Sequence, residues 1–403
     1  MKKLMILGGS RYAIPVINKA HELGCYVITC DYLPDNIAHK FSDEYCNVSI
    51  VDKDAVLNAA RRLEIDGITS FACDPGVVTA SYVADKMNLP TCGPYESVCI
   101  LQNKNLFRRF LSENGFNVPK SKAFKDYSEI GNEIADMHFP IIVKPTDSAG
   151  SKGVTRLDDL SKLKDAFDHA LSFSRSREVI IEEFITQKGY SSDSDSFSVD
   201  GRMELTSFSS QRFDKKADNP YVPAAFSWPS SISNDNQEIL KKEIQRLITL
   251  LGMQTSIYNI ETRESVDGIP YIMECSPRGG GNRLAECLEY ATGLKLIENV
   301  VRASMGMPLV KMEYKQSSGY IAEVIIHSIR SGIFDSLWIS DSIKQFVIEE
   351  DLWVTAGDTI GSFSAANESL GTIIFRFDDE SVMREVLDNI DEYIKVVLKT
   401  ENR

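Results

Sequence analysis

Residues 271–284, YIMECSPRGGGNRL, carry three chemically different side chains at every second position. Glu274, Ser276 and Arg278 supply a carboxylate, a hydroxyl and a guanidinium, and three glycines follow them. Alternate residues of a strand point to the same face, about 7 Å apart. The spacing therefore predicts a strand end that presents an acid, a neutral oxygen and a cation together. An ordinary strand end with a surface acid and a turn is the alternative.

A second acid, Glu261, ends the preceding apolar segment YNIE, and an Asp-Gly turn separates this segment from the strand of Glu274. Antiparallel neighbours bring opposed side chains close together, and two such carboxylates repel unless a cation lies between them. Mg²⁺ prefers oxygen ligands from one or two carboxylates plus substrate phosphates, and Ser276 can add a neutral oxygen. The alternative is a salt-bridge network in which Glu261 pairs with Arg263 or Arg278.

Small residues follow a buried strand in FPIIVKPTDSAGSKGV. Lys144 ends the apolar run, so we expect its ammonium at the rim of a cleft. The loop Gly150-Ser151-Lys152-Gly153 has a backbone that can approach phosphates closely. It is not a Walker A loop, because GxxxxGK[ST] is absent. An ordinary turn is the alternative.

Two further segments gain meaning from their order along the chain. In EVIIEEFI, the backbone of an acidic link can bind an adenine edge while Phe184 and Ile185 form apolar walls; an edge strand is the alternative. Lys104 lies in the helical stretch LQNKNLFRRFL and would by itself be a solvated surface charge.

The surrounding pattern predicts a mixed α/β and α+β protein. Strands and helices alternate over the first hundred residues, which indicates a parallel sheet with ligands at the carboxyl ends of its strands. The residues at those ends are Gly8, Gly9, Asp31 and Asp74. The first turn is GGS and not GxGxxG, so a dinucleotide-dependent oxidoreductase is a poor fit. Antiparallel pairs are predicted in the middle, one helix over 96–115, and a last helix over 382–398.

Composition excludes several classes of function. A net charge of −14 disfavours nucleic acid as a partner. No apolar run reaches the length of a membrane span, so no membrane association is expected. The eight cysteines form no CxxC pair and the five histidines no HxxxH pair, which disfavours zinc and fits reduced thiols in a cytoplasmic protein.

In their order, the lysine helix, VKP with its glycine loop, EEFI, Glu261 and ECSPR resemble the ATP-grasp superfamily of ligases. The resemblance is strongest to carbamoyl-phosphate synthase large subunits, biotin carboxylases and purine carboxylate–amine ligases. It implies an ATP-grasp fold with three domains. These are a Rossmann-like domain over 1–103, an ATP-grasp domain over 104–308 with a lid at about 115–185, and a small β-rich C-terminal α+β domain over 309–403. The glycine loop and residues 185–230 would form a mobile cover.

The resemblance also assigns roles to individual residues. The positions matching nucleotide-binding residues are Lys104, Lys144, Gly150, Ser151, Lys152, Gly153, Glu182, Glu183, Ile185 and Asp193. Glu261, Glu274 and Ser276 match a two-magnesium site, with Mn²⁺ as an alternative metal. Arg278 and Lys152 take the catalytic positions, where Arg278 steadies an acyl phosphate.

This sequence departs from the family pattern at three places. Ser276 replaces the usual asparagine, which leaves the geometry of the second metal open. Ser191 replaces an acid that often contacts ribose, so Asp193 is the substitute. Arg11 and Tyr12 replace an acid–histidine pair of glycinamide-ribonucleotide ligases, which disfavours that activity.

The expected activity is that of a Mg-ATP-dependent, ADP-forming carboxylate–amine (or –thiol) ligase that acts through an acyl phosphate. Its partners would be a small-molecule acid and an amine. Dimers are common in the family, which leaves a homodimer as one option. The alternatives are a phosphoribosylglycinamide synthetase-like enzyme, a biotin-carboxylase- or carbamoyl-phosphate-synthase-like enzyme, and a non-catalytic ATP-binding regulator.

Overall fold

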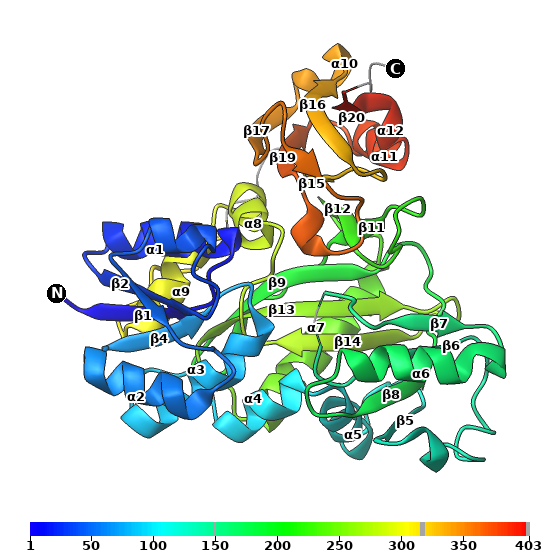
Figure 1. Ribbon diagram of the computed structural model, residues 1–403, viewed down its shortest axis with the longest axis horizontal. Helices are drawn as coiled ribbons and strands as arrows, with labels where there is room; N and C mark the ends of the chain where they lie inside the picture. The colour runs from blue at the N-terminus through cyan, green and yellow to red at the C-terminus, as the bar shows by residue number, and fades with distance from the viewer. Residues whose placement is uncertain (149, 315–318, 400–403) are drawn as a thin grey trace.

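The computed structural model describes residues 1–148, 150–314 and 319–399 (Figure 1). Ala149, in the predicted glycine loop, and the end of the predicted C-terminal domain at 400–403 lie outside the described residues. Figure 1 shows the N-terminal domain in blue at the left, the C-terminal sheets at the top, and a separate sheet carrying α6 at the lower right.

The first hundred residues form the predicted parallel sheet. Its strands, in the order β3-β2-β1-β4, are β1 Lys3–Leu7, β2 Tyr26–Asp31, β3 Glu44–Asn47 and β4 Gly67–Ser70. Its helices are α1 Ile14–Glu22, α2 Lys53–Leu63 and α3 Asp74–Met87. Alternate residues of β1 are buried in two different cores, as expected of a parallel sheet covered on both faces.

The predicted helix over 96–115 is wrong, because two helices occupy this stretch: α4 Tyr95–Gln102 and α5 Lys104–Glu113. Asn103 separates them in an extended conformation, and its side chain accepts a hydrogen bond from the Leu106 N–H at 2.9 Å. An asparagine that caps a new helix interrupts the previous one. The break makes Lys104 the first residue of α5.

Residues 121–183 form a four-stranded antiparallel sheet of their own, in the order β5-β8-β6-β7. Its strands are β5 Ser121–Phe124, β6 Ile141–Pro145, β7 Thr155–Leu157 and β8 Val179–Glu183. The helix α6 Leu163–Ser172 packs against β6 and encloses a separate apolar core. This unit coincides with the segment that we expect to act as a lid.

The central sheet has the order β10-β9-β13-β14 and is antiparallel. Its strands are β9 Ser192–Val199, β10 Arg202–Leu205, β13 Ser256–Glu264 and β14 Pro270–Ser276. The helix α7 Asn234–Leu250 packs on β14, and α8 Leu284–Thr292 and α9 Leu296–Ser304 follow the glycines after β14. Because α9 also packs against α1, the central sheet is joined to the N-terminal domain.

The last hundred residues share a sheet with the middle of the chain. The order β11-β12-β15-β19-β17 combines β11 Ser210–Phe213, β12 Pro223–Trp228, β15 Tyr320–Ile326, β17 Val347–Leu352 and β19 Gly371–Phe377. The predicted boundary at residue 309 therefore falls between strands of one sheet.

A second, three-stranded sheet has the order β18-β16-β20. It comprises β16 Gly332–Ile339, β18 Thr359–Ile360 and β20 Ile394–Leu398, with the helices α10 Asp341–Lys344, α11 Glu380–Asp388 and α12 Ile390–Tyr393 nearby. The predicted last helix over 382–398 is wrong in its final part, because the β-branched run IKVVL pairs with β16 as a strand.

All eight cysteines are free thiols, as expected. Within the described ranges, no helix is long and apolar enough to cross a membrane.

Candidate active site

Acidic and polar residues from three strands share one face of the central sheet. Glu261 of β13 is directly opposite Glu274 of β14, which is the antiparallel pairing that the sequence predicts. On its other side, Glu261 faces Asp193 of β9. One period along the strands, Asn259 lies between its partners in β9 and β14. Three strands thus contribute a row of oxygen atoms to one place.

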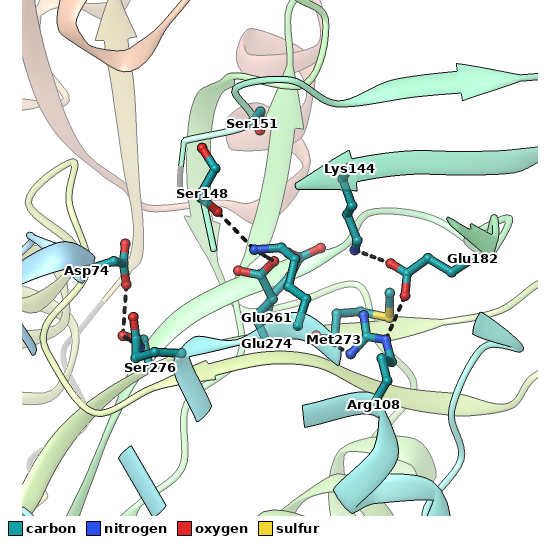
Figure 2. A network of polar contacts seen from close by, with 12 residues as sticks. Asp74, Arg108, Lys144, Ser148, Ser151, Glu182, Glu261, Met273, Glu274 and Ser276 are labelled. Carbon is teal, nitrogen blue, oxygen red and sulfur yellow. Dashed lines mark hydrogen bonds and ion pairs between the residues drawn. The ribbon is translucent and has the colours of Figure 1, made fainter. Parts of the chain in front are cut away.

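Two basic side chains pair with the opposed acids. The Lys104 Nζ lies 3.0 Å from a Glu274 carboxylate oxygen and donates to the Ser148 carbonyl oxygen at 3.1 Å (Figure 2). Arg263 donates to Glu261 at 2.8 Å, which is one of the salt-bridge alternatives weighed from the sequence. Burial alone would raise the pKa of Glu274, but the charges of Lys104 and Lys144 hold it below its ordinary value.

The two opposed acids are the residues that could hold a metal ion. Among the described residues, no group of three or more His, Cys, Asp or Glu side chains is placed to hold a metal ion. Two opposed carboxylates nevertheless fit Mg²⁺, which binds one or two carboxylates and completes its coordination with phosphates and water. Glu261 and Glu274 would hold it.

A buried ion network lies beside this row. Glu182 accepts from Arg108 Nε at 2.8 Å and is ion-paired with Lys144 (Figure 2). Burial would raise the pKa of Glu182, but Arg108 and Lys144 hold it at about 2, while burial lowers the pKa of Lys144. Lys144 is only 8% exposed, so it is more deeply buried than its predicted position at the rim of a cleft suggests. Arg108 is not among the predicted site residues, although it lies four residues after Lys104 on the same helical face.

The predicted adenine link and the predicted metal acids line one small cavity of about 30 Å³. Its lining residues are Ile142, Lys144, Glu182, Glu183, Phe184, Ile185, Glu261, Arg263, Met273 and Glu274. The Glu183 carboxylate accepts a hydrogen bond from the backbone N–H of His138 at 2.8 Å, which fixes this end of β8. The structure thus brings together residues separated by more than a hundred positions.

The glycine loop has an unusual backbone conformation. Gly150, Ser151 and Gly153 all have positive φ, between 57° and 72°. Such a conformation strains a serine, and a hydrogen bond from Ser151 Oγ to the Tyr221 carbonyl oxygen at 2.9 Å helps to hold it. Lys152 is exposed. The loop follows β6, the strand of Lys144, and the Ser148 carbonyl oxygen just before the loop accepts a hydrogen bond from the Lys104 ammonium.

Two residues of the row, Asp195 and Asn259, were not predicted from the sequence as site residues. Asp195 accepts a hydrogen bond from the Gly280 N–H at 2.8 Å, and Asn259 donates to Asp193 at 2.6 Å and to Asp195 at 3.3 Å. Burial raises the pKa of Asp193 to about 8, assisted by Glu261, and that of Asp195 to about 7. The alternation SDSDS was the signal, since both acids lie on one strand face.

The strand end ECSPR contacts the N-terminal domain. Arg278 forms a two-pronged ion pair with Asp74, through Nε at 2.9 Å and Nη2 at 2.7 Å. The Ser276 hydroxyl donates to Asp74 at 2.9 Å and accepts from Gln102 at 2.6 Å. In this structure, Ser276 therefore points to Asp74 and Gln102, and the metal role expected of it stays a prediction.

Residues 137–286 match the family model of the ATP-grasp domain. The chain contains an ATP-grasp domain. The matched range includes every predicted site residue from Lys144 to Arg278, and Lys104 lies on the helix that precedes it.

Two solved structures share the fold over nearly all of the chain. The L-amino acid ligase from Bacillus licheniformis has a TM-score of 0.82 and 20% identity, with 99% of both chains covered. The phosphoribosylglycinamide synthetase from Anaerococcus prevotii has a TM-score of 0.78 and 22% identity, with 99% of this chain and 100% of that chain covered. At such identities, the likeness shows that the whole chain adopts the ATP-grasp fold.

A curated relative also extends beyond the ATP-grasp domain. The uncharacterized protein y4rH from Sinorhizobium fredii (strain NBRC 101917 / NGR234) is 24% identical over 362 residues, which are 86% of this chain and 73% of that protein.

Proposed function

We propose that this chain is a Mg-ATP-dependent ligase that joins a small-molecule carboxylate to an amine and releases ADP and phosphate. The observation that carries the proposal is the opposed pair Glu261–Glu274 inside an ATP-grasp domain, with Lys104 and Lys144 beside it and Arg278 at the strand end. These are the charges that phosphoryl transfer needs, because its catalysis is mostly positioning and charge neutralisation.

The residues of this chain would act as follows. The Lys104 and Lys144 ammonium groups bind the phosphates of ATP, and the backbone of residues 150–153 covers them. The link at Glu183 and Ile185 binds adenine, and Asp193 is the proposed ribose contact. Glu261 and Glu274 would hold Mg²⁺, which would supply positive charge at the phosphates.

The reaction runs in two displacements. An oxygen of the substrate carboxylate attacks the γ-phosphorus, its bond to ADP breaks, and an acyl phosphate forms. Arg278 and Lys152 stabilise the negative charge of this intermediate. The amine nitrogen then attacks the acyl carbon, phosphate leaves, and the amine loses a proton. A closed glycine loop excludes water, which would otherwise hydrolyse the acyl phosphate.

Substrate identity is the open part of the proposal. The two structural neighbours named above are an L-amino acid ligase and a phosphoribosylglycinamide synthetase, so amino acids are the first candidates to assay, both as the acid and as the amine. A thiol acceptor and a homodimeric assembly belong to the same proposal.

The test is ADP release with Mg²⁺, measured against a panel of carboxylates crossed with amines. The proposal expects release that requires one acid and is stimulated by one amine. Turnover with bicarbonate alone would instead indicate a biotin-carboxylase-like enzyme. Tight ATP binding without turnover on any pair would indicate an ATP-binding regulator.

A further inference from the structure

The guanidinium of Arg278 is held by a residue of another domain. Asp74 begins α3 directly after the N-terminal sheet, whereas Arg278 follows the central sheet, and the two side chains meet through both carboxylate oxygens. A two-pronged arginine–carboxylate pair fixes the plane as well as the position of the guanidinium. Burial would raise the pKa of Asp74, but Arg278 holds it below its ordinary value, so the pair is ionic.

The Ser276 hydroxyl uses its proton and one of its two lone pairs in the same network. A serine hydroxyl has one proton to donate, and in this structure that proton goes to an Asp74 oxygen (Figure 2). The same Asp74 oxygen also accepts from Arg278 Nε. Gln102, the last residue of α4, donates to the same hydroxyl at 2.6 Å. A chain of hydrogen bonds thus runs from Gln102 through Ser276 and Asp74 to Arg278.

Counting the donors of Arg278 shows what the network leaves available. A guanidinium has five N–H groups. Two bind Asp74, and one on Nη1 donates to the Gly279 carbonyl oxygen at 2.9 Å. One N–H on Nη1 and one on Nη2 remain as donors for the oxygens of a carboxylate or of a phosphoryl group.

We infer that Asp74, with Ser276 and Gln102 behind it, is a positioning residue that orients Arg278 so that its remaining donors face the substrate carboxylate and its acyl phosphate. Ser276 then supports the arginine instead of completing the metal site, which accounts for a serine where the family has asparagine. The identity of the ligand as an acyl phosphate rests on the proposed function, whereas the orientation of Arg278 does not.

The experiment uses phosphonoacetate, an unreactive compound that carries a carboxylate and a phosphonate, and needs no turnover. It is titrated calorimetrically into the full chain saturated with ADP and Mg²⁺. A second titration measures the affinity for ADP with and without Mg²⁺. The variants are Asp74→Asn, Ser276→Ala, Ser276→Thr and Gln102→Met. Asp52→Asn, at the start of α2, and Ser256→Ala, an equally buried strand serine, are the controls.

We expect Asp74→Asn and Ser276→Ala to weaken phosphonoacetate binding by about tenfold, the usual effect of a lost hydrogen bond to a charged group. The gain in ADP affinity that Mg²⁺ provides should stay unchanged. Ser276→Thr, which keeps the hydroxyl, should restore binding, and the double variant Asp74→Asn/Ser276→Ala should be no weaker than Asp74→Asn alone. Gln102→Met should weaken phosphonoacetate binding less than Ser276→Ala does. If Ser276→Ala unfolds, Gln102→Met still tests whether the hydrogen-bond chain supports Arg278.

Two results would overturn the inference. One is that Ser276→Ala removes the Mg²⁺ effect on ADP affinity and leaves phosphonoacetate binding unchanged, as expected of a metal ligand. The other is that the wild-type ADP complex does not bind phosphonoacetate. Failure of the ligase proposal would appear separately, as ADP release that depends on no acid or amine while the variants still follow the expected pattern.

Discussion

Glu261 and Glu274 are directly opposed on β13 and β14, yet their carboxylates bind different cations, Arg263 and Lys104. Lys104 is therefore ion-paired with a carboxylate that the proposed metal site requires. In the proposed complex, Glu274 would hold Mg²⁺ and the Lys104 ammonium would pair with a phosphate, so neither charge would be left without a partner.

Glu274→Gln should abolish Mg²⁺-dependent ADP release and leave nucleotide binding largely intact. Glutamine keeps the size and one oxygen but removes the charge that a hard cation requires. The loss should appear mainly in kcat, because the metal acts at the transferring phosphoryl group. ADP release across a Mg²⁺ series, with the partly exposed Glu204→Gln as control, measures the effect. A near-normal kcat with an unchanged Mg²⁺ requirement would remove Glu274 from the metal site.

Lys144→Ala should weaken the binding of an unhydrolysed ATP analogue by about 1.5–3 kcal/mol, because a charge-assisted contact with the phosphates is lost. It should also lower the melting temperature, since Glu182 would keep only Arg108 as its partner. Calorimetric titration and thermal unfolding measure the two effects. Lys164→Ala, in which an exposed pair with Asp168 is lost, is the control. Unchanged affinity in a folded variant would contradict the phosphate role.

Arg108→Met should lower the free energy of unfolding by about 3–5 kcal/mol, because breaking a buried ion pair leaves an uncompensated charge. The neighbouring Arg109 is two-thirds exposed and pairs with Glu113 at 3.8 Å, so Arg109→Met should change stability by less than about 1 kcal/mol. Urea denaturation of the two variants gives the comparison. Equal effects would show that the Arg108–Glu182 pair contributes little.

Stability should fall as the pH rises from about 4 to 8. In the folded protein Asp193 has a pKa raised to about 8, first by burial and then by Glu261. Over this range the folded state holds a proton that the unfolded state has released, so each increase in pH favours unfolding.

Asp193→Asn does not titrate at this position and should reduce the fall, which melting temperatures between pH 5 and pH 8 would measure. Asp195, with a pKa raised to about 7, should retain part of it. An identical pH dependence in the wild type and the variant would show that Asp193 is ionised throughout.

Much of the local structure was predictable, because hydrophobic periodicity and turn residues determine it. The parallel order of the first strands follows from their alternation with helices, and the pairing of Glu261 with Glu274 follows from two apolar runs and an Asp-Gly turn. The errors lie where a local rule competes with a longer pattern. Asn103 interrupts a continuous helical periodicity. The segment at 394–398 continues a helical pattern in the sequence but forms a strand, because it pairs with β16.

The contacts of the site were less accessible, because they join distant segments. Nothing near Arg278 in the sequence indicates that Asp74 contacts it. Likewise, nothing near Lys144 indicates that it lies beside the buried ion pair of Arg108 and Glu182. A lysine after an apolar strand can lie at a rim or in an ion network with equal ease. Only tertiary packing decides between these arrangements.

The sharing of one sheet between residues 210–228 and the tail limits how this protein can exchange parts with relatives. A recombinant chain joined at residue 309 would pair β12 of one parent with β15 of the other, and a mismatch between the two strands would leave backbone N–H and C=O groups unpaired, which promotes association with other chains. Successful chimeras should therefore transfer β11 and β12 together with the tail. The unit to transfer is thus made of two separate segments of the sequence that form one sheet in the fold.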